Sequence, residues 1–319
     1  MWKYIRQFLP YAILAALSMV GEVLMDLIQP TMMSRIIDEG VLGSTNGGIS
    51  DMDLIRSLGL RMILLVLFGG FCGSMNNVFS HLAAQNAGNE IRKDAFRRIM
   101  SFSFEQIDRY TAGSLVVRVT NDITQIQNFI SMLFRGIIRT SFLTFGSICC
   151  MFLLSPRFGR IVLCVSPLIV LFLIFCLVKV NPLFDTLQAQ IDDINAILQE
   201  DVSGIRIIKA CVRESWEKLR FGKANAALVR TQLRTLVIFA FMNPVINALM
   251  YFAVALLLIA GGADVSSGAA SPGTIMAAIT YTTTLLNGIL GLVMISQNFS
   301  RGLASWRRIK EILEETPGM

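Results

Sequence analysis

The residues from which many active sites are built are scarce in this sequence. It contains one histidine, His81, so no catalytic set of nucleophile, histidine and acid can be assembled. Its six cysteines include no CxxC pair and no Cys/His spacing that would hold zinc. The Gly222–Lys223 pair is followed by Ala224, so the phosphate-binding pattern G-x-x-x-x-G-K-[ST] is missing. We therefore expect this chain alone to be no enzyme, with no catalytic residue, no metal site and no bound cofactor.

Charge is also scarce, at 16% of the 319 residues, whereas hydrophobic residues make up 54% and the mean hydropathy is +0.62. The apolar residues lie in long runs, and a membrane-spanning helix needs about 20 predominantly apolar residues. The first run has no small-residue cleavage pattern and holds two acids, so it is not a removable signal. The sequence predicts an all-α membrane protein with six spans, at about residues 9–34, 58–82, 136–154, 161–180, 236–260 and 275–297.

The basic residues are distributed unevenly around these spans. Six Lys and Arg lie between residues 83 and 128 and eight between 181 and 235, whereas Arg56 and Arg61 flank the first short connection. The positive-inside bias then places both long connections and both termini in the cytoplasm. Each basic cluster adjoins a span, which favours a lipid bilayer over nucleic acid as the partner of the positive charge.

The two long connections, about 83–135 and 181–235, are expected to be helical hairpins because neither contains a Pro/Gly cluster. A helix from Asp53 to Phe102 would be about 75 Å long, against about 30 Å of hydrocarbon. Each hairpin must then project far into the cytoplasm and turn at a tip. The tips are expected at Phe104–Thr111, before a break at Thr111–Gly113, and within Gly204–Ser215.

Polar residues recur on one face of three spans, where they are costly in lipid and are suspected of function. They are Glu22, Asp26 and Gln29, then Asn243 and Asn247, then Thr280, Thr284, Asn287 and Asn298. One interpretation is a substrate cavity in which the two acids favour a cationic or hydrogen-bonding ligand. For the Thr and Asn residues, interhelical hydrogen bonds of about 1 kcal/mol each are an equal alternative. The acids could instead pair with Arg35 or Arg61 near the outer leaflet.

One stretch resembles a known family. RKDAFRRIMSFSFEQIDRYTAGSLVVRVTNDITQIQ, residues 92–127, is similar to the first intracellular loop of bacterial ABC exporters of the multidrug and lipid-flippase type. Three further segments resemble other parts of that family. The end of its first span is similar to SRIIDEGV at 34–41, and its second intracellular loop is similar to EDVSGIRIIKACVRESWEKLRFGKAN at 200–225. The junction before its ATPase domain is similar to RIKEILEETP at 308–317. The sequence departs from the pattern at Ile107, where an aromatic is usual, and at Ala112, where a polar residue is common.

The resemblance implies that residues 1–319 form the transmembrane domain of a half-transporter. Its partner is a second copy or a homologous half-transporter, with helices exchanged in a domain-swapped dimer in the bacterial plasma membrane. Short coupling helices, by position Phe104–Thr111 and Arg206–Arg213, dock into a nucleotide-binding domain that is absent here and that carries ATP and Mg. The residues implied in coupling are Phe104, Gln106, Asp108, Arg109, Tyr110 and Thr111 at the first tip, and Arg206, Ile208, Lys209, Cys211 and Arg213 at the second.

The full-length protein is then expected to be an ATP-hydrolysing translocase that exports drugs, lipids or other amphiphiles by alternating access. The chain is either a piece of a longer transporter or, as the second choice, a separately encoded permease. An alternative function is a stand-alone membrane binding or channel module that uses this fold without an ATPase, although a channel has no need of two projecting tips. The cargo, and the choice between homodimer and heterodimer, stay open.

Overall fold

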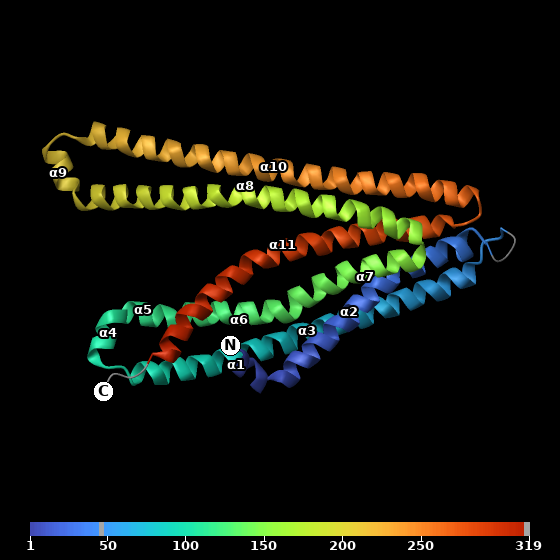
Figure 1. The fold of residues 1–319 in the computed structure, drawn as a ribbon, viewed down its shortest axis with the longest axis horizontal. Coiled ribbons are helices and arrows are strands. Elements are labelled where there is room, and N and C mark those ends of the chain that lie inside the picture. The colour runs from blue at the N-terminus through green and yellow to red at the C-terminus, as the bar shows by residue number, and fades with distance from the viewer. Residues whose placement is uncertain (45–47, 316–319) are drawn as a thin grey trace. The chain divides into compact units, whose positions relative to one another are not determined.

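The computed structural model describes residues 1–44 and 48–315, with side chains at all of these positions except 293, 294, 296–298 and 300. The described chain is all-helical and contains no strand (Figure 1). Six of its helical stretches are long and apolar enough to cross a membrane, and they begin at Leu9, Met52, Ala112, Pro156, Glu214 and Pro272. The predicted all-α class with six membrane-spanning helices is therefore confirmed.

The chain divides into two compact units, and the first comprises Met1–Val162 and Val254–Met319. Its elements are α1 (Trp2–Gln7), α2 (Leu9–Arg35), η1 (Ile36–Val41), α3 (Met52–Met100), α4 (Phe104–Tyr110), α5 (Ala112–Val117), η2 (Arg118–Asp122), α6 (Ile123–Met132), η3 (Leu133–Ile137), α7 (Ile138–Leu154) and α11 (Pro272–Glu314). The three η segments are π-helical turns within longer helices. In this unit α2 packs along α3, and α11 packs along both α7 and α2.

The second unit, residues 163–253, is a helical hairpin. Its elements are α8 (Pro156–Ser203), α9 (Ile205–Ala210) and α10 (Glu214–Ser266), of which α8 begins and α10 ends in the first unit. Arg220 of α10 binds Glu200 of α8 at 2.7 Å, and the rings of Phe184 and Phe239 lie 6.2 Å apart. At 48 and 53 residues, α8 and α10 are about 70 and 80 Å long, more than twice the hydrocarbon thickness.

Helices extend further than predicted at several ends. The helix of the first span continues beyond α2 through η1. The helices α8 and α11 begin earlier than predicted, at Pro156 and Pro272, because proline's fixed φ suits the first helical positions. The predicted break at residues 111–113 is confined to Thr111, whose φ is +57°. The Thr111 hydroxyl accepts a hydrogen bond from the Ser114 backbone N–H at 3.4 Å, so α5 begins at Ala112 without a longer turn.

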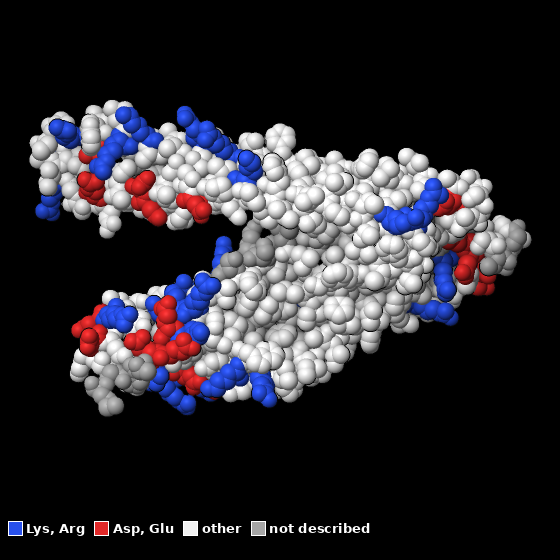
Figure 2. Space-filling model, in the orientation of Figure 1, with Lys and Arg blue, Asp and Glu red and all other residues white. Residues whose placement is uncertain are grey.

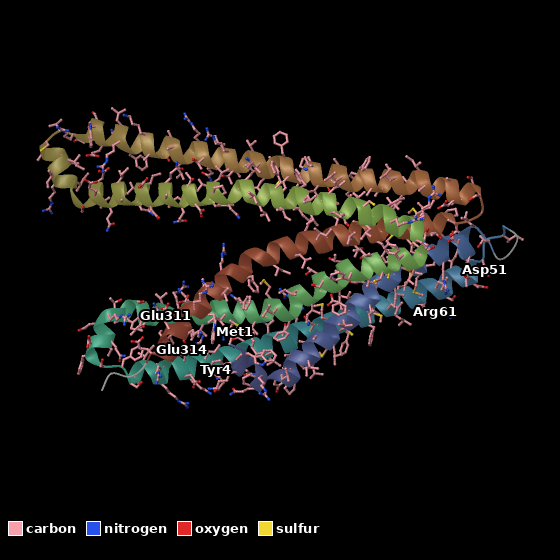
Figure 3. The ribbon with its side chains drawn as sticks, viewed as in Figure 1. Met1, Tyr4, Asp51, Arg61, Glu311 and Glu314 are labelled. Carbon is pink, nitrogen blue, oxygen red and sulfur yellow. The ribbon has the colours of Figure 1, made fainter. Side chains whose placement is uncertain are left out.

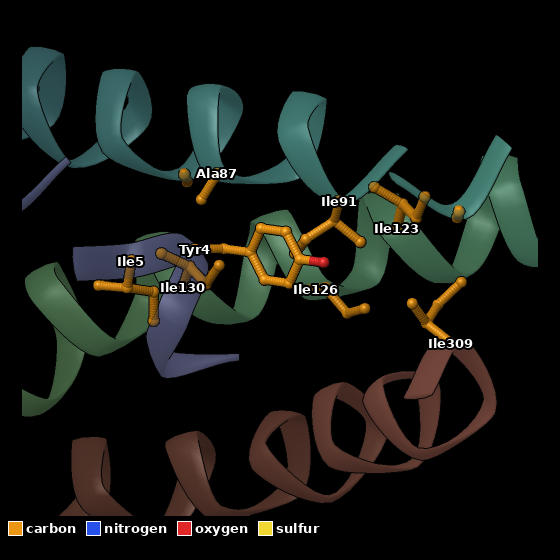
Figure 4. Close-up of a cluster of buried hydrophobic side chains, with 10 residues drawn as sticks. Tyr4, Ile5, Ala87, Ile91, Ile123, Ile126, Ile130 and Ile309 are labelled. Atoms are coloured by element: carbon orange, nitrogen blue, oxygen red, sulfur yellow. The ribbon is translucent and has the colours of Figure 1, made fainter. Parts of the chain in front are cut away.

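Apolar side chains from four helices of the first unit, α1, α3, α6 and α11, form a buried cluster (Figure 4). They are Tyr4 and Ile5 of α1, Ile91 of α3, Ile123, Ile126 and Ile130 of α6, and Ile309 of α11. Burying each contributes about 1.5–3 kcal/mol, so α1, the first hairpin and the end of α11 form one packed block. The Tyr4 hydroxyl donates to Asp94 of α3 at 2.9 Å. Burial and this hydrogen bond raise the pKa of Tyr4 to about 12, so the phenol stays neutral.

Candidate functional site

A cavity of about 530 Å³ lies between α2, α3, α7 and α11 of the first unit. Its lining mixes polar and apolar groups, and it consists of Asp26, Gln29, Pro30, Met33, Met62, Arg139, Thr140, Leu143, Thr280, Thr284, Asn287 and Gly288. This volume suits a drug-sized ligand, and the few polar groups among apolar ones are typical of sites that orient such ligands.

The structure brings five of the nine predicted cavity residues together in this lining: Asp26, Gln29, Thr280, Thr284 and Asn287. Glu22 lies one helical turn from Asp26 on α2 and contacts the same arginine of the lining. The other three predicted residues are not among those described around the cavity. Asn243 and Asn247 lie on α10 in the second unit, and the side chain of Asn298 lies outside the described residues.

Glu22 and Asp26 share one cationic partner, Arg139 of α7. Its Nη2 donates to Asp26 Oδ2 at 3.1 Å, and its Nη1 donates to the Glu22 carboxylate. The predicted alternative, pairing with Arg35 or Arg61, is therefore wrong. The sequence did carry a signal for the right partner, because Arg139 is the one charged residue of the predicted span 136–154 and a lone charge in a span needs a partner.

Close packing of α2 on α3 holds the Glu22 carboxylate in place. A Cβ on Gly73 of α3 would lie 2.7 Å from Glu22 Oε2, and one on Gly69 would lie 3.2 Å from Met25 Cβ. On the same interface the buried Asn76 donates to the Ala15 carbonyl at 2.7 Å. The glycines thus leave the space that the acid occupies, and a side chain at position 73 would require the Glu22 carboxylate to shift.

The hydroxyl hydrogens of the cavity threonines bond within their own helices. The hydroxyls of Thr280 and Thr284 donate to the carbonyls four residues earlier on α11, at 3.0 Å each, and Thr140 does the same on α7 at 2.8 Å. The choice between a ligand and a neighbouring helix as the partner of these threonines therefore stays a prediction. Their oxygen lone pairs remain as acceptors. Tyr281 of α11, which was not predicted, bonds to a neighbouring helix: its hydroxyl donates to the Leu27 carbonyl of α2 at 2.5 Å.

Asp38 of η1 joins the C-terminal end of α2 to the first turn of α11. Its carboxylate accepts from the Gly273 backbone N–H at 2.8 Å and from the Ser271 hydroxyl at 2.5 Å, and so it caps the first turn of α11 from another helix. Ser34 donates to the same carboxylate at 3.2 Å. Along the α2–η1 helix Asp38 is about 8 Å beyond Met33 of the cavity lining, so it joins α2 and α11 just beyond the cavity.

At the first tip, α4 is fastened to the residue that follows α11. Ser103 and Gln106 form a capping box at its start, and the Tyr110 hydroxyl donates to Glu315 Oε2 at 3.1 Å. Burial and this hydrogen bond raise the pKa of Tyr110 above its ordinary value. Gln106 Nε2 donates to Glu315 Oε1 at 3.4 Å, and the Arg109 guanidinium lies 3.8 Å from it. Three of the predicted coupling residues thus contact the chain's own C-terminal segment.

Other predicted residues of this tip point to solvent. Phe104 is 90% exposed, and Asp108 and Thr111 are exposed as well. These three side chains are therefore accessible from solvent.

Ionic contacts continue this attachment along α11. Asp122, only 4% exposed, accepts from Ser305 at 2.9 Å and from Arg308 Nε at 2.8 Å. Arg118 donates to Glu311 and to the Arg308 carbonyl, both at 2.9 Å. Figure 3 shows Glu311 and Glu314 beside the first tip, and Asp51 and Arg61 at the opposite end of the same unit. The first hairpin and α11 are therefore joined by several charge-assisted bonds as well as by the apolar core.

The second tip is the six-residue helix α9, which begins one residue before the predicted segment and ends at Ala210. The helix cannot continue to Arg213 as predicted, because Val212 adopts a φ of +52°. Of the predicted residues Arg206, Lys209, Cys211 and Arg213 are exposed and Ile208 is half-buried. Ile207 and Val212, at 70% and 81% exposure, add apolar surface that the sequence prediction missed.

Long membrane helices, a polar cavity between them and two short helices at the tips of extended hairpins define a multi-pass membrane transport domain. The chain belongs to the ABC transporter transmembrane region family, whose model matches residues 12–290. The resemblance seen in the sequence is thereby confirmed.

Curated relatives agree with this assignment. Over 98% of its length the chain is 32% identical to YfiB, an uncharacterized ABC transporter ATP-binding protein of Bacillus subtilis, and covers 54% of that protein. Over 83% of its length it is 24% identical to an ATP-dependent lipid A-core flippase of Syntrophus aciditrophicus, of which it covers 44%. An uncharacterized ABC transporter ATP-binding protein of Mycobacterium tuberculosis, Rv1273c, is 26% identical over 95% of the chain, which covers 52% of it. The chain spans about half the length of the curated relatives it matches.

Proposed function

We propose that this chain is the substrate-translocating part of an ATP-driven exporter in the bacterial plasma membrane, working by alternating access. Two such domains, from identical or homologous chains, form a dimer that exchanges helices. Both hairpins and both termini lie in the cytoplasm, where α4 and α9 contact ATPase domains that bind ATP and Mg and hydrolyse the nucleotide. The full-length transporter is then a translocase, whereas this chain supplies the cavity and the coupling helices.

The attachment of α4 to Glu315 supports this proposal most directly. Residues 308–317 resemble the junction before an ATPase domain, and Tyr110 and Gln106 of the first tip bind within that junction. The same helix, α11, carries Thr280 and Thr284 of the cavity. A movement passed to Glu315 by an attached ATPase domain could therefore reach the cavity along this one helix.

The composition of the cavity supports an amphiphilic cargo. Met33, Met62 and Leu143 offer apolar contacts, and Thr280, Thr284 and Asn287 offer hydrogen-bonding groups. Two carboxylates face one guanidinium in the Glu22–Arg139–Asp26 set, so its net charge is negative and favours a cationic group on the cargo.

Reconstituted full-length transporter tests this proposal. Asp108→Arg places a cation on the exposed face of α4. We expect the amount of a cationic amphiphilic dye taken up into inside-out vesicles for each ATP hydrolysed to fall about tenfold. Asp193→Arg is the matched control, because it makes the same charge change at an exposed position of α8, away from both tips. Unchanged coupling in Asp108→Arg would contradict the role of α4, and dye flux without ATP would favour the channel module instead.

A further inference from the structure

The three threonines of the cavity lining are fixed as hydrogen-bond acceptors. The hydroxyl hydrogens of Thr140, Thr280 and Thr284 are each used in a bond to the carbonyl four residues earlier on the same helix, at 2.8, 3.0 and 3.0 Å. A hydroxyl has one hydrogen and two lone pairs, so in this arrangement each oxygen can accept from a ligand but cannot donate to it. The cavity wall thus holds a set of acceptor oxygens.

Packing of α11 on α7 keeps two of these oxygens in one wall. A Cβ added to Gly288 of α11 would lie 2.4 Å from Thr144 Oγ1, and one added to Gly291 would lie 2.5 Å from Thr140 Cγ2. The two helices approach this closely because neither glycine has a side chain. Thr284 precedes Gly288 by one helical turn and lies on the same side of α11, so Thr140 and Thr284 both line the cavity.

Asp26 of α2 adds further acceptor oxygens. Its Oδ2 accepts from Arg139 at 3.1 Å, whereas its Oδ1 forms no bond with any residue that the structure describes. Pro30 lies four residues later and has no amide hydrogen for the Asp26 carbonyl, which therefore lacks its usual helical donor. Asp26 and Pro30 both belong to the cavity lining, so α2 brings a carboxylate with an available oxygen to the same cavity as the threonines.

The lining of the cavity, as far as the structure describes it, contains no Phe, Tyr or Trp. This composition bears on the kind of cation that fits. Proteins recognise quaternary ammonium groups with aromatic rings, because such a cation has no N–H group to donate. A primary ammonium instead carries three N–H donors, which acceptor oxygens satisfy. The acceptor-rich lining therefore suits a primary ammonium better than a quaternary one.

Charged side chains of the first unit gather away from the cavity. Figure 2 shows its Lys, Arg, Asp and Glu toward its two ends on the face drawn, with uncharged residues between them. Asp26 and Arg139 belong to α2 and α7, which run through this uncharged stretch (Figure 1). A cation in the cavity therefore has to be bound by the lining itself.

We infer that the cavity selects a primary ammonium group on the cargo, and that the three threonines determine this specificity together with Asp26. The ammonium pairs with Asp26 Oδ1 and donates its remaining hydrogens to threonine oxygens. A trimethylammonium group has the same charge but donates no hydrogen bond, so it would leave these acceptors without water and without a partner. This inference rests on the proposed function, which supplies a cationic amphiphile, and adds the class of cation.

Three amphiphiles with the same alkyl chain test this inference: dodecylamine, dodecyltrimethylammonium and dodecanol. Native mass spectrometry of the full-length transporter, titrated with each of them in detergent, measures the fraction of transporter that carries the amphiphile. A primary alkylamine, like the lysine side chain, is protonated at pH 7, so the first two amphiphiles carry the same charge. We expect dodecylamine to bind about tenfold more tightly than dodecyltrimethylammonium.

A pair of substitutions tests the threonines. Thr280→Val/Thr284→Val keeps the shape of both side chains and removes two acceptors, and we expect it to weaken the binding of dodecylamine about three- to tenfold without changing that of dodecyltrimethylammonium. Thr280→Ser/Thr284→Ser keeps the hydroxyls and should bind like the wild type. Thr282→Val/Thr283→Val is the matched control, because these hydroxyls also bond to the carbonyls four residues earlier on α11 but lie outside the described lining.

The preference of the wild type decides the inference even where a variant fails to fold. Equal binding of the two cations would overturn it, and so would equal losses of both cations in Thr280→Val/Thr284→Val or the same loss of dodecylamine in the control. If both cations bind alike but more tightly than dodecanol, the cationic cargo of the proposed function stands and only the primary-ammonium site is wrong. If neither cation binds more tightly than dodecanol, the proposed cationic cargo is wrong as well.

Discussion

Arg139 shows how one residue decides the chemistry of the cavity. Without it, Glu22 and Asp26 would be two unpaired acids in a membrane helix, at a cost of several kcal/mol. With it, they form an ion-paired set that still carries one excess negative charge and stays half-exposed, with 34% of the Asp26 side chain accessible. A cation on the cargo can therefore interact with Asp26 while Glu22 stays paired with Arg139.

A first prediction concerns this excess charge. Glu22→Gln leaves Asp26 and Arg139 balanced, so we expect the affinity for a cationic amphiphile to fall about three- to tenfold, with little change for a neutral analogue. Fluorescence titration of both ligands measures the effect. Glu105→Gln, at an exposed position of α4, makes the same change far from the cavity and serves as the control. Equal affinities for the cation in wild type and Glu22→Gln would assign the acid a structural role alone.

A second prediction concerns the space beside Glu22. In Gly73→Ala the new methyl group would meet the carboxylate at 2.7 Å, whereas at Gly70 no atom lies within 4 Å of an added Cβ. We expect Gly73→Ala to destabilise the protein by about 1–3 kcal/mol and Gly70→Ala to leave it unchanged or slightly stabilised. Thermal unfolding in detergent compares the two variants. Similar unfolding temperatures would show that α2 moves away from α3 easily.

At the scale of elements, α11 is the helix that connects the proposed functions. It begins at a cap supplied by Asp38, contributes Thr280 and Thr284 to the cavity, and ends at Glu314, next to Glu315, which binds α4. The contacts at its two ends join α11 to other helices, so we expect a displacement at either end to be passed along α11 to the cavity.

A third prediction tests the outer cap. Asp38→Ala removes the acceptor of the Gly273 amide and the Ser271 hydroxyl, and we expect about 1 kcal/mol of stability to be lost with it. Hydrogen exchange should rise at the amides of the first turn of α11, residues 272–275, and stay unchanged at the inner end. Glu39→Ala, in the same π-helical turn, has no such role and is the control. Uniform exchange in both variants would contradict the cap.

At the scale of the whole molecule, the arrangement requires one end of the hairpins to be far from the membrane. The native thiol Cys211 follows α9 and is exposed. Ile49, which is 72% exposed, lies in the connection between η1 and the start of α3. The positive-inside bias places these two positions on opposite sides of the membrane.

A fourth prediction follows from this difference. A membrane-impermeant maleimide should label Cys211 in inside-out vesicles and leave it unlabelled in intact cells. Ile49→Cys in a Cys211→Ser background should give the reverse pattern. Labelling of Cys211 in intact cells would reverse the proposed orientation.

Much of this architecture was predictable because it depends on properties of neighbouring residues. Runs of apolar residues determined the six membrane helices, the lack of Pro/Gly clusters determined the long hairpins, and the residues around Phe104 indicated the family. The errors lie at helix ends, such as Thr111 and Val212, where a single residue at positive φ decides where a helix stops. The faces of α2 and α11 were also predictable, since helical periodicity placed Asp26 and Thr284 toward one cavity.

Only the tertiary structure decided which side chains meet. Arg139 and Glu22 are 117 positions apart, and Tyr110 and Glu315 are 205 apart. Their contacts depend on how each helix is rotated and shifted against its neighbours, and a rotation by one residue, about 100°, would point a side chain elsewhere. Hydropathy and periodicity determine that a helix forms and which of its faces is apolar. Packing of glycines against acids, and of one helix end against another, decides the partner of each charge.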